Sequence, residues 1–421
     1  MEEYKFNSRR PDLKVNTKSH IDTSVELWSE VRPVGRHPSR RSYHSACVWR
    51  NQMLIYGGQD LREGPQGGLW ALRIPEVNSG EDEEWVEIPI EDRGPLCRHT
   101  GIVKDNRMFI FGGSNGDREF NNTLVLDLIS LQWTVWTPDV PTCPPPLDSH
   151  TACLYEEASV GWMVVFGGFV QGDRTNEVYI LNLNTAKWKN AKVTGIKPPS
   201  RSNHSAVVYR DHLFIFGGSN DEGEKLNDLW KLDLRTYNWE QIHGLGQVPT
   251  PRSGQTAILY KDYMIIFGGM RDITKETNEM HSYEFSSNLW TMFQDEQQIK
   301  DPVSAAQLEE FKKAKSPLMP RSKTINTESP HKSSEANRSP ELSSGDSSPT
   351  RGKRASLYIG PAAPVVGKIN GKAPHPRDGH SSILFGDMMV VFGGDRHQMP
   401  FNDVYSYALV EQTIKTPLIL N

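Results

Sequence analysis

Histidine recurs along the chain at a fixed place relative to pairs of glycines, which makes it the first candidate for chemistry. It stands thirteen residues before the first glycine of a pair in four copies and seventeen before in a fifth, and glutamine replaces it in a sixth. These residues are His44, His99, His150, His204, Gln255 and His380. A zinc ion needs all of its nitrogen ligands within about 2.1 Å, whereas neighbouring packed sheets lie about 10 Å apart. We therefore predict structural histidines, no metal site and no other cofactor.

Cations in the turns that follow the glycine pairs are the second candidate. Each turn carries a cation among acids, and the cations singled out are Arg62, Arg118, Arg174, Lys225, Arg271 and Arg396. Arginine binds carboxylates through two parallel hydrogen bonds where the geometry allows. Phe169 and Phe401 lie in the same turns and are predicted to supply apolar anchors. We predict that these residues form a rim that binds a partner protein through an acidic peptide segment; solvated turns with weak local ion pairs are the alternative.

The elements that position these turns are six copies of one apolar phrase. The copies are MLIYGG, MFIFGG, MVVFGG, LFIFGG, MIIFGG and MVVFGG, which end at Gly58, Gly113, Gly168, Gly218, Gly269 and Gly394. The first five follow one another at intervals of 50 to 55 residues, and 125 residues separate the last two. A continuous apolar run of this length predicts a strand that is covered on both faces. Gly-Gly then permits backbone conformations and close approaches that a Cβ atom would forbid.

Each copy contains enough sequence for four strands. The histidine opens one strand, the apolar phrase is the second, and segments such as NEVYILNL and NDLWKLDL predict a third. A tryptophan marks the fourth strand in five copies, at Trp85, Trp133, Trp188, Trp239 and Trp290. Four antiparallel strands per repeat are typical of one blade of a β-propeller. The sequence therefore predicts an all-β, six-bladed propeller.

The paired glycines, a preceding Arg-x-x-His such as Arg41 to His44 or Arg201 to His204, and the trailing tryptophan resemble kelch repeats. The resemblance covers nearly all of residues 22 to 410 outside one insertion. It implies a kelch β-propeller similar to the kelch portions of leucine-zipper-like regulators and of the Rab effector with kelch motifs. In that family the mouth formed by these turns is a common docking face. The 21 residues before the first strand are too short for the BTB, BACK or F-box modules of ubiquitin-ligase adaptors, so we expect a stand-alone propeller.

The two ends of the chain are predicted to complete one blade together. The sixth copy stops near residue 410 without its tryptophan strand, while residues 25 to 31, VELWSEV, carry Trp28 without a blade of their own. Pairing this segment with residues 402 to 409 would close the ring and remove an exposed sheet edge. Because a closed ring needs no second chain, we expect a monomer.

The extra residues between the fifth and sixth copies form a Ser/Pro/Lys-rich insertion that lacks the apolar content of a core. We expect a flexible arm over residues 1–21, the propeller over 22–293 and 371–410, a disordered insertion over 294–370 and a tail over 411–421. Short patterns in the insertion resemble kinase targets, and the predicted phosphorylation sites are Ser316, Ser329, Ser339, Ser348 and Ser356. Phosphate adds about two negative charges per site and would let the insertion dock on basic rim residues.

Composition narrows the class of function. The net charge is −5 and the pI is near 6.2, which argues against a nucleic-acid binder. The first residues have no apolar signal segment and no run is long enough to span a membrane, so we expect a cytoplasmic protein with no membrane insertion. The four cysteines lack zinc spacing and are interpreted as small buried residues.

Binding is favoured over catalysis, and no catalytic residue is predicted. Plant kelch specifier proteins use an iron site of the pattern Glu-x3-Asp-x3-His, but Glu224 and Asp228 are followed by Leu232 here. The repeated boxes of propeller sialidases and the H-E-x-x-H zinc motif are also missing from the sequence. We expect a protein-interaction scaffold or adaptor. A propeller enzyme, or a ubiquitin-ligase substrate receptor that works with a separate subunit, is the alternative.

Overall fold

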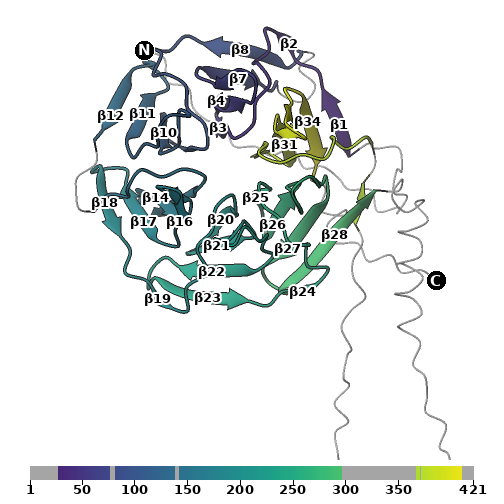
Figure 1. Cartoon of the computed structure of the whole chain (residues 1–421). Coiled ribbons are helices and arrows are strands. Elements are labelled where there is room, and N and C mark those ends of the chain that lie inside the picture. The colour runs from purple at the N-terminus through teal and green to yellow at the C-terminus, as the bar shows by residue number, and fades with distance from the viewer. Residues whose placement is uncertain (1–26, 76–80, 138–141, 296–366, 370, 410–421) are drawn as a thin grey trace, which may run out of the picture.

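The strands of the protein are arranged in six sheets around a central axis. A computed structural model describes residues 27–75, 81–137, 142–295, 367–369 and 371–409. Viewed along the axis, the sheets stand side by side as the blades of a closed ring (Figure 1). This arrangement confirms the prediction of an all-β, six-bladed propeller.

Each blade contains four antiparallel strands that run outward from the axis in chain order. Blade 1 has β3 (Ser45–Trp49), β4 (Gln52–Tyr56), β7 (Leu69–Arg73) and β8 (Glu84–Ile88). Blade 2 has β9 (Thr100–Lys104), β10 (Arg107–Phe111), β11 (Thr123–Asp127) and β12 (Trp133–Trp136). Blade 3 has β13 (Thr151–Glu157), β14 (Val160–Phe166), β17 (Val178–Asn182) and β18 (Lys187–Asn190).

The other three blades repeat the pattern. Blade 4 has β20 (Ser205–Tyr209), β21 (His212–Phe216), β22 (Leu229–Asp233) and β23 (Asn238–Ile242). Blade 5 has β25 (Thr256–Tyr260), β26 (Tyr263–Phe267), β27 (Met280–Glu284) and β28 (Leu289–Asp295). Blade 6 has β30 (Ser381–Phe385), β31 (Met388–Phe392), β34 (Val404–Ala408) and, from the start of the chain, β1 (Trp28–Val31).

Short strands extend the outer edges of three blades and form hairpins in three turns. β2 (Val34–Gly35) pairs in parallel with β8, β19 (Thr194–Gly195) with β23, and both β24 (Leu245–Gly246) and β29 (Gly367–Ile369) with β28. The hairpins are β5 (Gln59–Asp60) with β6 (Gly64–Pro65), β15 (Phe169–Val170) with β16 (Asp173–Arg174), and β32 (Asp395–Arg396) with β33 (Met399–Pro400). The predicted insertion therefore has strand residues at both of its ends, and its residues 296–366 and 370 lie outside the described residues.

The hydrophobic core is divided among the six interfaces between blades. Each of six buried clusters draws its members from two neighbouring blades, including blade 6 and blade 1. The second strand of each blade is buried on both faces, as its continuous apolar sequence predicts. No blade buries its faces alone, so the stability of each depends on its neighbours.

An aromatic contact repeats at all six interfaces. The aromatic residue before each glycine pair packs against the fourth-strand tryptophan of the next blade, with ring centroids 4.7–5.8 Å apart. The pairs are Tyr56 with Trp133, Phe111 with Trp188, Phe166 with Trp239, Phe216 with Trp290, Phe267 with Trp28, and Phe392 with Trp85. Trp28 therefore supplies the fourth-strand tryptophan of blade 6, which the other five blades take from their own repeat.

The repeated histidines link the blades through a second ring of contacts. Nε2 of each histidine lies 2.8–2.9 Å from a Ser or Thr hydroxyl of the preceding blade, and Gln255 Nε2 lies 3.3 Å from Ser205 Oγ. The pairs are His44 with Ser381, His99 with Ser45, His150 with Thr100, His204 with Thr151, Gln255 with Ser205, and His380 with Thr256. Burial lowers the pKa of His99, His150 and His380 to about 3, so these imidazoles are neutral.

The glycine pairs are required because the repeated histidine or glutamine and a backbone carbonyl oxygen approach each pair. In blade 1, a Cβ on Gly57 would lie 2.8 Å from Cε1 of His99 in the next blade, and one on Gly58 would lie 2.9 Å from Cβ of His44 in its own blade. Both glycines also have positive φ values of 65° and 106°. Equivalent contacts recur at the other five pairs. The close approach inferred from the sequence is thus confirmed, and both a backbone carbonyl oxygen, such as that of Leu96 against a Cβ on Gly57, and the repeated histidine or glutamine make it.

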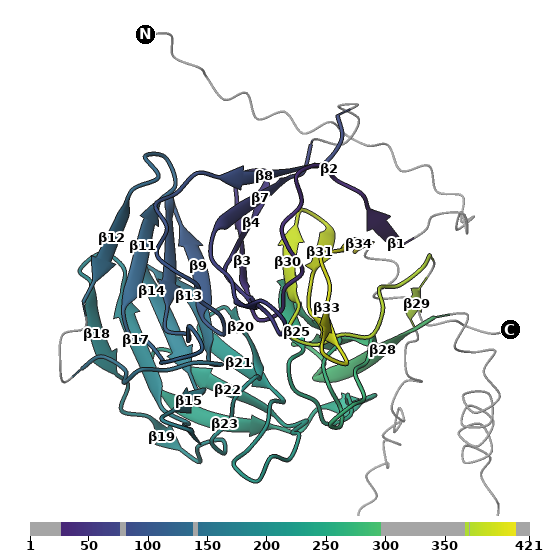
Figure 2. The ribbon, with the colours of Figure 1, turned by 45° about the horizontal axis from the view of Figure 1, so that its top comes forward.

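The ring closes where the two ends of the described chain meet. β1 pairs antiparallel with β34, with Trp28 opposite Tyr407 and Val31 opposite Val404. Figure 2 shows the purple β1 beside the yellow β34. Blade 6 is therefore completed by β1, as predicted. The edge of β34 that faces away from the axis is paired with β1 and is not left exposed.

Shortening Trp28 should destabilise the whole ring. Its side chain is 1% exposed and packs against Phe267 and Tyr407, so we expect Trp28→Ala to cost about 3–5 kcal/mol of unfolding free energy. The matched control is Ser29→Ala, because Ser29 is exposed on the same strand. The measurement is the denaturant midpoint of the full chain. Equal midpoints for the two variants would contradict closure through β1.

Acid should weaken the ring through its buried histidines. Burial and the nearby Arg201 hold the pKa of His204 well below its ordinary value. The unfolded chain binds a proton at His204 below about pH 6.5 whereas the folded chain does not, so stability is full above that pH and is lost as the pH falls. His204→Gln copies the natural Gln255 and should reduce the pH slope of unfolding free energy by about 1.4 kcal/mol per unit below pH 6.

Chemical denaturation at a series of pH values measures that slope. His243→Gln is the matched control, because His243 is exposed. If His204→Gln and His243→Gln gave the same slope, the histidine ring would not be a source of acid sensitivity.

Candidate functional site at one mouth of the ring

The mouth at which the first strands begin is closed by a ring of backbone hydrogen bonds. Each of six residues donates its N–H to the carbonyl oxygen of its counterpart in the preceding blade, at 2.7–3.0 Å. These residues are Tyr43, Arg98, Ser149, Asn203, Gly254 and Gly379. All six have φ values between 52° and 69°, a region that only glycine adopts without strain. The ring surrounds a central cavity of about 160 Å³ and fixes the spacing of the six blades at this mouth.

The six turns after the glycine pairs stand around this backbone ring. Every turn begins with a bridge between the residue after the glycine pair and the residue two before the histidine, as in Ser42 with Gln59 and Asp378 with Asp395. The same bridge recurs in all six blades. The predicted rim is thus assembled at a single mouth, on rigid supports.

The structure divides the six predicted rim cations into two groups. Arg118 and Arg174 lie over the rings of Phe120 and Phe169 at 5.0 and 4.6 Å. Lys225 Nζ donates to Ser219 Oγ at 3.0 Å, and Arg271 pairs with Glu279. Burial lowers the pKa of both Lys225 and Arg271. These four cations are engaged within the protein.

Arg62 and Arg396 form the second group. Within the part of the chain that the structure describes, neither side chain has a hydrogen bond, ion pair or ring contact. Arg62 lies at the tip of the blade 1 turn and Arg396 in the blade 6 turn, which are neighbours around the ring. These two guanidinium groups are the rim cations that no described residue engages.

Exposed apolar side chains gather on the same side of the mouth. Ile273 is 87% exposed, and Leu61 and Met399 are each 55% exposed. They lie in the turns of blades 5, 1 and 6, which are consecutive in the ring. A cavity of about 340 Å³ separates the turns of blades 5 and 6 and is lined by Arg271, Lys275, Glu276, Arg396 and His397, among others. We name the set Leu61, Arg62, Ile273, Arg396 and Met399 the 5–6–1 surface.

The two predicted aromatic anchors lie inside the turns. The guanidinium of Arg174 lies over the ring of Phe169. The ring of Phe401 stacks on His375 and contacts the guanidinium of Arg377, whose Cζ is 4.4 Å from the ring centroid. The sequence analysis missed Leu61 and Ile273. The position of Leu61 in a turn between Gly58 and Gly64 is the signal that could have identified it, and no such signal marks Ile273.

Acids of the mouth are partly buried. Tyr43 donates its hydroxyl hydrogen to Asp378 Oδ2 at 2.8 Å, and burial raises the pKa of Asp378 to about 6. Burial also raises the pKa of Asp148 and of Asp395. Among the described residues, no group of three or more His, Cys, Asp or Glu side chains is placed to hold a metal ion.

Buried arginines under the mouth bind acids that stand immediately before the third strand. Arg201 donates through both Nη atoms to Asp228 at 2.8 Å, Arg377 does the same to Asp403 at 2.7 and 3.0 Å, and Arg252 Nη2 contacts Glu279 at 2.7 Å. Asp228, which the sequence comparison with iron-dependent kelch enzymes singled out, is therefore an ion-pair partner here. Arg41 holds the equivalent position in blade 1.

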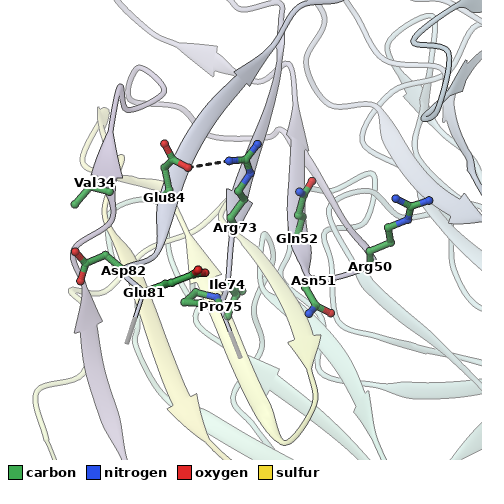
Figure 3. Close-up of a pocket in the computed structure, with 10 residues that line it drawn as sticks. All are labelled: Val34, Arg50, Asn51, Gln52, Arg73, Ile74, Pro75, Glu81, Asp82 and Glu84. Carbon is green, nitrogen blue, oxygen red and sulfur yellow. Dashed lines mark hydrogen bonds and ion pairs between the residues drawn. The ribbon is translucent and has the colours of Figure 1, made fainter. Parts of the chain in front are cut away.

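A larger cavity of about 940 Å³ lies beside β7 and β8 at the other end of blade 1. Arg73 of β7 and Glu84 of β8 form an ion pair of 2.9 Å and line it together with Val34 and Pro75 (Figure 3). Residues 76–80, which connect Pro75 to the far wall, lie outside the described residues. The five predicted phosphorylation sites, from Ser316 to Ser356, also lie outside them. In the segments described here, no helix is long and apolar enough to cross a bilayer.

Comparison with known proteins places this architecture. The family described as the KLHDC2/KLHL20/DRC7 Kelch-repeats domain matches residues 6–160 and 135–313. The chain is 26% identical to the Leucine-zipper-like transcriptional regulator 1 homolog of Drosophila melanogaster over 316 residues, which are 71% of this chain and 30% of that protein. It is 30% identical to Kelch domain-containing protein 3 of Bos taurus over 311 residues, which are 65% of this chain and 77% of that protein.

A third relative is Host cell factor 2 of Homo sapiens, 30% identical over 273 residues, or 58% of this chain and 33% of that protein. The chain thus spans about a third of the fly regulator and of Host cell factor 2, and about three quarters of Kelch domain-containing protein 3. Kelch propellers typically act as protein-interaction modules. The matched repeats, the six blades and the Gly-Gly, His and Trp contacts between them show that this chain belongs to the kelch-repeat family.

Proposed function

We propose that this chain is a non-catalytic adaptor that binds another protein on the 5–6–1 surface. The observation that carries the proposal is the coincidence, on three consecutive turns, of exposed apolar side chains with two arginines that have no partner among the described residues. Single exposed apolar residues need no explanation. Three of them beside two free guanidinium groups and a cavity of about 340 Å³ are what a small interface needs.

The chemistry of the surface favours a partner segment that is both apolar and acidic. Ile273, Leu61 and Met399 would be buried by it, and each fully buried side chain of this size contributes about 1.5–3 kcal/mol. Arg62 and Arg396 would pair with its carboxylates at the edge of the contact, where they set the rate and specificity of association more than its strength. The backbone ring below holds the three turns in place, so binding need not order them first.

The wider rim of six cations, with Phe169 and Phe401, remains our proposal for the full extent of the docking face. Arg118 and Arg174 can contact a partner without leaving their aromatic rings, because a guanidinium over a ring keeps its edge free for carboxylates. Regulation by phosphorylation at Ser316, Ser329, Ser339, Ser348 and Ser356 stays a prediction from the sequence. A phosphorylated segment would compete for the same free arginines.

Reversing the two free charges should release the partner. We expect Arg62→Glu with Arg396→Glu to weaken binding about tenfold or more, and the loss should shrink at high salt because rim charges are screened. The measurement is quantitative recovery from native lysate on the full chain, followed by the Kd of the recovered protein. The matched control is Arg50→Glu with Arg210→Glu, at exposed turns between first and second strands. Equal recovery on both variants would contradict the proposed surface.

Removing the apolar tips should weaken the same complex independently of salt. Ile273→Ser with Met399→Ser is expected to lose about 2 kcal/mol or more of binding free energy if these side chains are the anchors. Ile196→Ser is the control, since Ile196 is 79% exposed in the connection between blades 3 and 4, on the opposite side of the ring. A Kd that changes as much for Ile196→Ser as for the tip variant would refute the anchor role.

A further inference from the structure

Four blades bury an arginine in one and the same pose. Nη1 of the arginine donates to the carbonyl oxygen of the first glycine of its blade: Arg41 to Gly57 at 2.8 Å, Arg201 to Gly217 at 2.9 Å, Arg252 to Gly268 at 3.2 Å and Arg377 to Gly393 at 2.8 Å. These side chains are at most 2% exposed. The shared anchor means that the other face of each guanidinium points to the same place in its blade.

In the part of the chain that the structure describes, three of the four places hold a carboxylate and the fourth holds none. The strand register identifies this place. In each blade, the last aromatic residue of the second strand pairs with the first residue of the third strand, and the acid stands immediately before that first residue. These acids are Asp228, Glu279 and Asp403 in blades 4, 5 and 6. Tyr56 pairs with Leu69 in blade 1, so the equivalent residue is Gly68. Among the described residues, Arg41 donates only to neutral groups, namely the carbonyl oxygen and Oγ of Ser39 and the carbonyl oxygen of Gly57.

The serine does not replace the missing acid. In blade 5, Thr250 Oγ1 accepts from Arg252 Nη2 at 3.0 Å, as Ser39 Oγ does from Arg41 Nη2, and Glu279 binds the same guanidinium as well. Arg41 therefore has donors left that its counterparts spend on a carboxylate. Burial lowers the pKa of Arg41 to about 10, and the negative charge of Glu87 raises it. Glu87 is itself in an ion pair with Arg36.

The place at Gly68 is open and has a second donor. Within 4 Å, a Cβ built on Gly68 would meet only Nε1 of Trp70, at 3.7 Å. In blade 4 the equivalent Trp230 donates from Nε1 to Asp228 Oδ2 at 2.6 Å. The carboxylates of Asp228, Glu279 and Asp403 keep 16–25% of their side chains exposed, so solvent reaches this depth in the other blades. Arg41 and Trp70 thus correspond to the two side chains, Arg201 and Trp230, that donate to Asp228 in blade 4, but Gly68 supplies no carboxylate.

We propose that an aspartate or glutamate side chain of the bound partner fills this place, with its carboxylate accepting from the Arg41 guanidinium and from Trp70 Nε1. The inference rests on the proposed function, because Gly68 ends the turn that carries Leu61 and Arg62. Burying a cation without a carboxylate raises the free energy of the folded protein, so a ligand that supplies a carboxylate to it gains binding free energy. The subsite therefore selects an acid at one position of the partner segment.

The test needs no partner. The full chain is labelled with ¹⁵N-tryptophan, and the indole N–H signals are followed by NMR while N-acetylglutamate amide is added; Trp70→Phe assigns the signal. We expect a saturable downfield shift of the Trp70 signal in the millimolar range, and none with N-acetylglutamine amide, which lacks the charge. The Trp230 signal is the internal control, because Asp228 already occupies its site. An unmoved Trp70 signal would overturn the proposal.

Two further arms make the assignment specific. Gly68→Asp supplies the missing carboxylate from the chain itself and should abolish the shift; aspartate tolerates the positive φ of Gly68, 82°, better than most residues do. A Trp70 response that persists in a folded Gly68→Asp variant would contradict the site. N-acetylglycine tests a chain-terminal carboxylate instead, and a stronger response to it than to the glutamate probe would refute a side-chain ligand. Loss of the partner on the Arg62 and Arg396 variants is read separately, so the two proposals can fail independently.

Discussion

The ring depends on one packing arrangement, in which an aromatic residue and two glycines of one blade meet the histidine and the tryptophan of the next. The glycines let the imidazole lie against the backbone, its Nε2 reaches a hydroxyl of the preceding blade, and the indole covers the aromatic ring. Because both partners belong to different blades, the arrangement bonds blades to each other rather than strands within a blade. The closing contact of His44 with Ser381 and of Trp28 with Phe267 follows the same rule.

The mouth inherits its rigidity from that arrangement. The residue before each repeated histidine, or before Gln255, is held in the left-handed region and hydrogen-bonded to its neighbour, whether it is Tyr43, Arg98 or Gly254. Strain of about 1–3 kcal/mol at a non-glycine residue persists only where the surroundings over-determine the backbone. A closed ring of six hydrogen bonds does so here. The turns above can then vary in sequence without moving the supports, which is how one fold presents different binding surfaces.

The fold could be predicted because its signals are local and repeated, whereas the site depends on contacts between distant residues. The apolar phrases, Gly-Gly and the tryptophans each specify a strand or a close approach, and Trp28 was found because one blade lacked its tryptophan. Which rim cations are free could not be predicted, since Lys225 is engaged by Ser219 across its own turn and Arg174 by Ser202 beyond β18. The backbone ring left no signal, because its six members share a conformation and not a residue type.

Departures from the repeat are informative when only one member of an interacting pair has changed. In blades 2 and 3, Leu96 and Leu147 stand where the buried arginine would be, so no charge is left inside, and Glu177 of blade 3 pairs instead with Lys197 at the surface. Replacing a buried ion pair by apolar groups costs little, but removing one partner leaves a charge that must be compensated. Blade 1 contains Arg41, but Gly68 stands where the other three blades with this arginine have an acid. A fold that needed the arginine for packing alone could have used leucine there, as its neighbours do, and the retained charge therefore favours a function that lies outside the chain.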